Sequence, residues 1–102
     1  MEQIERIRYM EKLFDLATEA TAKLSMSIEE YQKTEKIISI LSDYYGSNEW
    51  KKDFEADETG LLPKDLKRGV LSEDGIWNLL SLWKDIEKTR HPRGNTFIPD
   101  TV

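Results

Sequence analysis

The sequence contains no cysteine and a single histidine, His91. Without cysteine, the chain forms no disulfide, offers no thiolate nucleophile and has no cysteine-ligated zinc or iron–sulfur site. A catalytic triad or a histidine-based metal site needs further partners around its imidazole, and one histidine beside Pro92 does not supply them. We therefore assign no catalytic, cofactor-binding or metal-binding residue and expect no cofactor.

Long apolar runs and an excess of basic residues are also missing. No apolar run approaches the roughly 20 residues that span a bilayer, and residues 1–6 lack the apolar core of a signal peptide. The formal net charge is −5, which argues against general nucleic-acid binding because that needs a basic surface. We expect a cytoplasmic protein that binds another protein, but no nucleic acid and no membrane. The sequence leaves open whether the chain forms a homo-oligomer.

Apolar residues recur at steps of three and four, which is the helical period. The pattern predicts an all-α fold, a small helical bundle with an antiparallel hairpin (about 3–24 and 28–45), a short helix (about 48–56) and a C-terminal helix (about 73–90). The short connection within the hairpin favours antiparallel packing. At 102 residues the chain has the size of one domain. We expect this domain to comprise residues 1–90, followed by a flexible C-terminal tail, 91–102.

Local signals indicate where these helices begin and end. Ser27 followed by Glu30 forms a capping box, and Ser72 has the position of an N-cap for the last helix. Gly46 is expected to end the second helix in a left-handed conformation. Residues 63–71 indicate a turn or a single helical turn that ends at Gly69.

The centre of the chain carries a long motif. It comprises Asp43-Tyr44-Tyr45-Gly46-Ser47, Trp50, Asp53, Glu55, Asp57-Glu58, Gly60, Leu62-Pro63 and the run from Asp65 to Asp74. This motif resembles the bacterial domain-of-unknown-function family 4298, with similarity over about residues 3–90. The resemblance implies a small helical bacterial protein without an established activity. It carries over no catalytic residue.

Four carboxylates, Asp53, Glu55, Asp57 and Glu58, lie close together in the sequence. The first three fit the first, third and fifth positions of a calcium-binding loop. However, the glycine needed at the sixth position is Glu58, and the bidentate glutamate needed at the twelfth is Lys64. A solvated acidic helix end is the simpler interpretation. The alternative, a small-ligand or metal-dependent enzyme that uses these carboxylates, stays open.

Three cations, Lys64, Lys67 and Arg68, precede the last helix. A helix N-terminus with flanking cations favours phosphate, but this helix opens with Glu73 and Asp74, which repel an anion. Two interpretations remain. The cations pair with the nearby carboxylates, or they face outward toward a partner.

Aromatic residues at helical spacing usually belong to a core, and Trp77 is the exception because it lies one position off the apolar stripe of its helix. By elimination we predict a non-enzymatic protein-interaction domain that acts through its helical faces or through the loop 57–72. Its candidate interaction surface comprises Lys64, Lys67, Arg68 and Trp77.

Overall fold

The computed structural model describes residues 2–23 and 25–90. In these ranges the chain forms α1 (Gln3–Thr21), α2 (Ile28–Tyr45), α3 (Asn48–Glu58), the short 3-10 helix η1 (Gly69–Leu71) and α4 (Glu73–Arg90), and it forms no strand. The predicted all-α bundle is confirmed. The predicted tail, 91–102, and His91 lie outside the described residues.

Two of the predicted helix starts have the expected caps. The Ser27 hydroxyl accepts a hydrogen bond from the Glu30 N–H (3.1 Å), and the Glu30 carboxylate accepts one from the Ser27 N–H (3.0 Å). The Ser72 hydroxyl accepts from the Gly75 N–H (3.2 Å). Each cap satisfies a backbone donor that has no partner within the helix, and this fixes the first turn.

Other helix bounds differ from the prediction. The first helix ends at Thr21 rather than near residue 24. At this end the Ala22 N–H is shared between the Thr18 and Glu19 carbonyls. The third helix continues to Glu58 rather than 56. The turn predicted to end at Gly69 instead has a 3-10 helix that begins there. Apolar periodicity marks the face of a helix more reliably than its last residue, because frayed ends keep the same spacing.

The left-handed glycine is also a different one. Gly46, predicted to be left-handed, has φ −87°, whereas Gly60 has φ +73°. At the end of α3 the Leu61 N–H donates to the Ala56 carbonyl (2.9 Å) and the Gly60 N–H donates to the Asp57 carbonyl (3.1 Å). These two bonds define a Schellman motif, which requires a left-handed residue after the helix. The prediction for Gly46 was therefore wrong.

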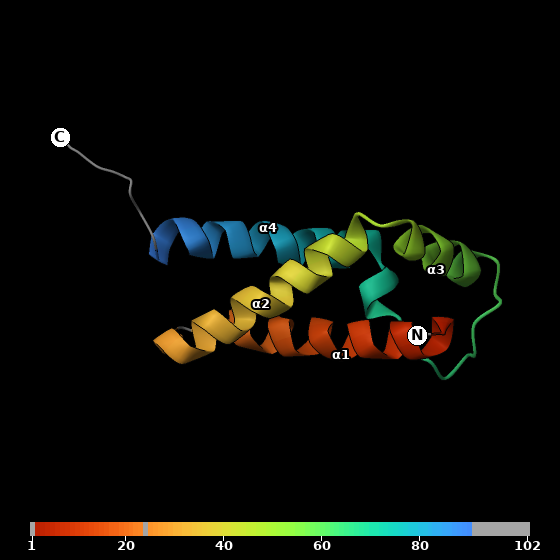
Figure 1. Cartoon of the computed structure of the whole chain (residues 1–102), viewed down its shortest axis with the longest axis horizontal. Helices are drawn as coiled ribbons and strands as arrows, with labels where there is room; N and C mark the ends of the chain where they lie inside the picture. Colours follow the sequence, from red (N-terminus) through yellow and green to blue (C-terminus); the bar gives the residue numbers. More distant parts are fainter. Residues whose placement is uncertain (1, 24, 91–102) are drawn as a thin grey trace.

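The three long helices surround the core. α1 and α4 run toward the same end of the molecule, and α2 runs back across them at an angle (Figure 1). The largest fully buried apolar side chains come from α1, α2, η1 and α4: Ile7, Leu41, Val70, Leu71 and Ile76. Tyr31 of α2 stacks on Trp83 of α4, with ring centroids 4.9 Å apart. None of the helices in the described ranges is both long and apolar enough to cross a membrane.

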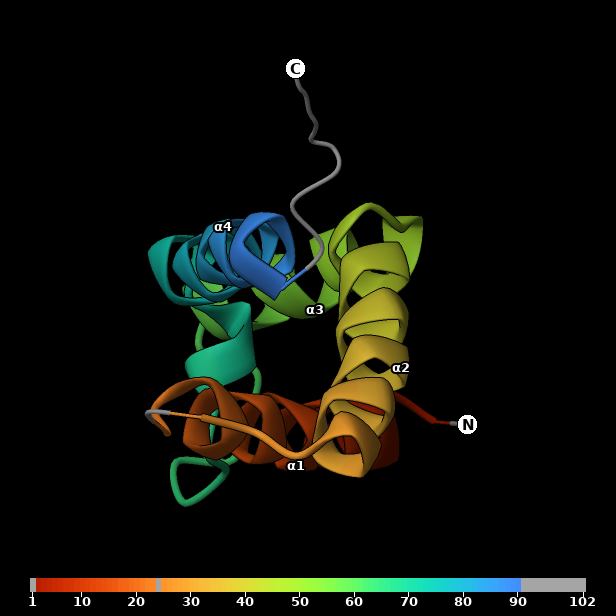
Figure 2. The same ribbon diagram turned by 90° about the vertical axis from the view of Figure 1, so that its left-hand side faces the viewer.

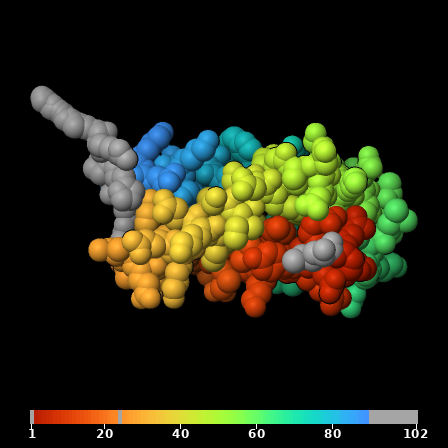
Figure 3. Space-filling view, viewed as in Figure 1, coloured from red at the N-terminus to blue at the C-terminus, as the bar shows by residue number. Residues whose placement is uncertain are grey.

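The two sides of the space between α1 and α4 are covered differently. α2 covers one side along much of its length (Figures 1 and 3). On the other side η1 stands between α1 and α4 (Figure 2). η1 lies beside the start of α4 and does not extend along its second half (Figure 1).

The two glycines give a test of the chain reversal after α3. Gly60→Ala should destabilise the fold by about 1–2 kcal/mol, because an L-residue in the left-handed region is strained. Gly46→Ala should be neutral or slightly stabilising, since its φ is negative and an added Cβ would be 3.7 Å from the nearest atom, the Ser42 carbonyl oxygen. Urea denaturation of both variants measures the difference. Equal losses would contradict the Schellman end of α3.

Candidate functional site

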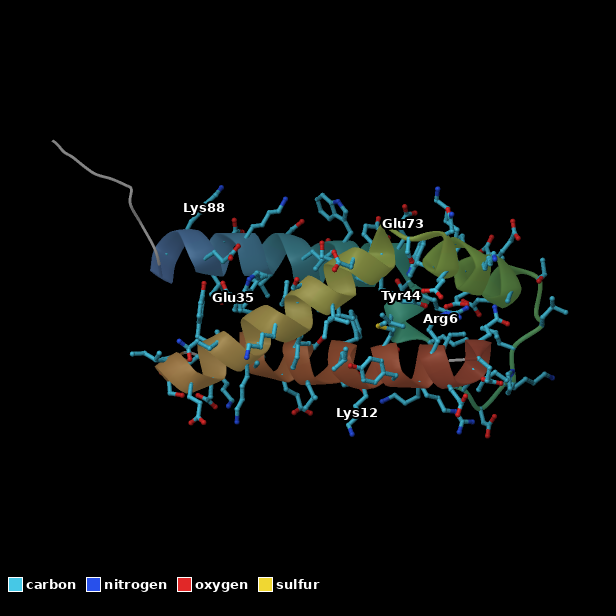
Figure 4. The ribbon with its side chains drawn as sticks, viewed as in Figure 1. Arg6, Lys12, Glu35, Tyr44, Glu73 and Lys88 are labelled. Carbon is cyan, nitrogen blue, oxygen red and sulfur yellow. The ribbon has the colours of Figure 1, made fainter. Side chains whose placement is uncertain are left out.

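Asp53 of α3 is completely buried and accepts four hydrogen bonds. Its Oδ1 accepts from Gln3 Nε2 (3.0 Å) and from Arg6 Nη2 (2.6 Å). Its Oδ2 accepts from Arg6 Nε (2.9 Å) and from the Tyr44 hydroxyl (2.6 Å). Arg6 and Tyr44 come from α1 and α2 and lie near each other beside α3 (Figure 4). One carboxylate therefore joins three helices.

The electrostatics of this cluster favour an ionised Asp53. Burial alone would raise its pKa, but the hydrogen bonds from Arg6, Tyr44 and Gln3 outweigh burial and hold the pKa below its usual value. The hydrogen bond to Asp53 raises the pKa of Arg6. Burial, followed by the hydrogen bond to Asp53, raises the pKa of the Tyr44 hydroxyl. The cluster is thus a charged aspartate with a charged arginine and a neutral tyrosine.

The carboxylates near Asp53 do not form one site with it. The prediction of a solvated acidic helix end is wrong for Asp53, whose oxygens are both occupied by donors. Asp57 pairs with Arg68 (3.2 Å), and Glu55 and Glu58 are exposed. Across residues 2–23 and 25–90 no three acidic or histidine side chains come close enough together to hold a metal ion.

A second buried arrangement fixes the loop before α4. The Val70 N–H donates to the Glu11 carboxylate (2.8 Å), and the Val70 carbonyl accepts from Trp50 Nε1 (3.2 Å). Glu11 and Trp50 are both buried. A Cβ added to Gly69 would lie 3.1 Å from a Glu11 oxygen and 3.3 Å from Phe14, so glycine lets α1 approach this closely. Side chains from α1 and α3 thereby hold η1 in place.

The four residues of the predicted interaction surface do not gather in one place. Lys67 pairs with Asp15 of α1 (3.1 Å), and the hydrogen bond between them raises the pKa of Lys67. Arg68 pairs with Asp57. Lys64 is exposed. The connection after α3 passes below the start of α1, whereas α4, which carries Trp77, lies on the opposite side of the bundle (Figure 1). Trp77 is 57% exposed.

Several hollows lie on the surface of the described residues, and two of them bear on the choice of a site. The first, which we call the α1–loop hollow, has a volume of about 390 Å³ and is lined by residues of both charge signs, among them Arg8, Lys12, Asp15, Asp65 and Lys67. Lys12 extends away from the bundle there (Figure 4).

The second, which we call the α1–α4 groove, has a volume of about 590 Å³. It lies between the end of α1 with the connection that follows it and the second half of α4. Its apolar lining includes Met26, Leu82 and Ile86, and its charged lining is Lys23 and Asp85. Leu82 is 43% exposed.

The sequence did not single out this groove. In the helical pattern of α4, Leu82 lies on the flank of the apolar stripe and Ile86 lies within it. The feature of the sequence that could have indicated the groove is the width of the apolar face of α4. Residues at 76, 79, 80, 82, 83 and 86 cover a broader arc than a two-helix contact needs.

These features define the class of protein as an all-α domain whose most specific polar contacts lie between its own helices. The profile described as "Domain of unknown function (DUF4298)" matches residues 7–89, and the chain belongs to this family. Comparison with curated proteins and with solved structures gave no match.

The role of Asp53 can be tested by removing its charge. Asp53→Asn should destabilise the fold by roughly 3 kcal/mol, because Arg6 loses its closest counterion and keeps only the exposed Glu49 at 3.7 Å, and because the amide NH₂ must face two donors. Asp57→Asn is the matched control, since its pair with Arg68 is partly exposed and should contribute below about 1 kcal/mol. Chemical denaturation measures both. Similar losses of unfolding free energy in the two variants would show that the buried cluster contributes no more to stability than an exposed ion pair.

The contribution of the Asp53 carboxylate to stability should also depend on pH. The pKa of Asp53 is lower in the folded chain than in the unfolded one. Its contribution is therefore present above the unfolded value of about 3.9 and is lost as the pH falls through the folded pKa. Melting temperatures recorded from neutral pH downward should fall more steeply in acid for the natural chain than for Asp53→Asn. Parallel curves would contradict the depressed pKa.

Proposed function

We propose that this chain is a non-enzymatic protein-interaction domain that acts through its helical faces. The observation that carries the proposal is the contrast between the loop 57–72 and α4. In the loop, most of the large apolar side chains are buried: Leu62, Leu66, Val70 and Leu71. Two of its cations, Lys67 and Arg68, pair with carboxylates of the chain itself. The loop thus uses most of its distinctive residues within the fold.

The outer surface of α4 offers more to a partner. Trp77 on one side and Leu82 on another are both exposed. Single exposed apolar residues are common on protein surfaces, but tryptophan contributes strongly to binding wherever it is covered, and Leu82 lies in a groove. Leu61 is the exception within the loop, since it is 78% exposed.

An enzymatic role for the carboxylates has less support. Asp53 has both oxygens occupied by protein donors. Releasing it for a metal or substrate would leave the Arg6 side chain, which is only 12% exposed, without its closest partner, and this is costly. We also propose a cytoplasmic location in a bacterium, with protein partners and neither nucleic acid nor membrane. The cysteine-free sequence is compatible with a reducing compartment.

Binding by variants of the full chain tests the proposal. The immobilised chain is exposed to an extract of its native cells alongside three variants. The loop variant combines Lys64→Glu, Lys67→Glu and Arg68→Glu, and the two helix variants are Trp77→Lys and Leu82→Lys. We expect the loop variant to retain the same proteins as the natural chain, and at least one helix variant to lose them. Melting curves verify that each variant is folded.

Two results would contradict this function. Loss of the bound proteins only in the loop variant, or in Leu61→Lys, would assign binding to the loop 57–72. A rise in melting temperature with calcium or magnesium that disappears in Glu55→Gln or Glu58→Gln would favour the metal-dependent alternative. Equal retention by all variants would indicate nonspecific adsorption.

A further inference from the structure

The α1–α4 groove lies on the same side of the bundle as η1, opposite α2. α2 covers one side of the space between α1 and α4, and η1 covers the start of the other side (Figures 1 and 2). The groove lies farther along α4 than η1, and it follows α4 from Leu82 to Thr89. At a rise of about 1.5 Å per residue this is a length of about 10 Å, or two helical turns.

The floor of the groove is continuous with the core. Met26 and Ile86 are partly buried and pack against the buried cluster, while Leu82 beside them is 43% exposed. An apolar side chain placed between them would therefore contact residues that the fold already holds in position. Pre-formed apolar grooves of this kind bind amphipathic helices through residues spaced three and four apart.

The charges of the groove favour a cationic occupant. Lys23 pairs with Glu30, and the hydrogen bond from Lys23 lowers the pKa of Glu30 to about 2. Asp85 on the opposite rim has no ion pair in the part of the chain that the structure describes. The uncompensated charge of the lining is thus negative, and so is the net charge of the whole chain, −5.

We propose that the α1–α4 groove binds a cationic amphipathic helix of a partner protein, with apolar side chains between Met26, Leu82 and Ile86 and a basic side chain at Asp85. This inference rests on the proposed function and specifies its site and the chemistry of its partner. A helix fits better than an extended segment, because η1 shows that a helical turn fits between α1 and α4. An extended strand would find no sheet edge in the described residues to supply its backbone hydrogen bonds.

The α1–loop hollow is a weaker candidate. Its lining mixes cations and carboxylates, and two of them, Lys67 and Asp15, form an ion pair with each other. It therefore selects neither sign of charge. The α1–α4 groove combines a larger volume with an apolar floor and one unpaired carboxylate, which is the combination that gives both affinity and orientation.

Synthetic peptides test the proposal on the full chain. The probe is a Leu/Lys peptide of about four helical turns with its leucines spaced three and four apart. One control has the same composition with the leucines spread around the helix, and a second replaces lysine by glutamate. Calorimetry gives the affinities, and methyl resonances of Leu82 and Ile86 report where the peptide binds. We expect the first peptide alone to bind and to shift these resonances.

The variants separate the groove from the rest of α4. Leu82→Lys should weaken binding about tenfold or more, because it places a charge in the apolar floor and repels the peptide. Trp77→Lys is the matched control on the same helix and should stay within about twofold of the natural chain. Asp85→Asn should weaken binding less than Leu82→Lys and should reduce its salt dependence.

Each other outcome overturns the proposal. Equal binding of the scrambled peptide rules out recognition of an amphipathic face. Tighter binding of the glutamate peptide would show that the groove prefers an anionic helix rather than a cationic one. Loss in Trp77→Lys but not in Leu82→Lys moves the site to another face of α4, while the proposed function through helical faces stands. Resonance shifts on dilution assign the groove to a second copy of the chain, and shifts on truncation after Arg90 assign it to the chain's own C-terminal residues.

Discussion

The arrangement of the helices depends first on the carboxylate of Asp53. A buried charge is tolerated only when its hydrogen-bonding capacity is met, and here four donors from α1 and α2 meet it. Arg6 presents two of them in a fixed fork, and this restricts the orientation of the first turns of α1 relative to α3. Hydrophobic burial stabilises this bundle without specifying such an angle, because it is not directional.

The hydrogen bonds of Glu11 and Trp50 to Val70 extend the same constraint to η1, just before α4. Trp50 lies one turn before Asp53 on α3, and Glu11 lies little more than one turn after Arg6 on α1. Once Asp53 aligns the two helices, Glu11 accepts from the Val70 N–H and Trp50 donates to the Val70 carbonyl. Most of the residues that take part, namely Tyr44, Trp50, Asp53, Gly69 and Val70, belong to the central motif of the sequence. These residues of the motif therefore serve contacts within the fold.

The sequence predicted the helices well and their polar contacts poorly, for one physical reason. Helical periods and Ser27 or Ser72 caps are local signals, set by residues a few positions apart. The pairing of Arg6 with Asp53 spans 47 residues and that of Glu11 with Val70 spans 59. Nothing in the spacing of Asp53, Glu55, Asp57 and Glu58 distinguishes the buried carboxylate from its exposed neighbours. The glycine assignment failed differently, since Gly46 and Gly60 both follow helices, and only backbone geometry shows which one is left-handed.

The exposure of Leu82 follows from this topology. α2 crosses the bundle at an angle and η1 is a single turn, so the elements opposite α2 cover only the beginning of α4 (Figure 1). The connection from Thr59 to Arg68 passes by the other end of the molecule and does not reach the second half of α4. Within the described residues, the groove at Leu82 is bordered by the end of α1, the connection that follows α1, and α4 itself. A helix from another molecule would instead extend the packing that η1 begins, and it would bury apolar surface without rearranging the bundle.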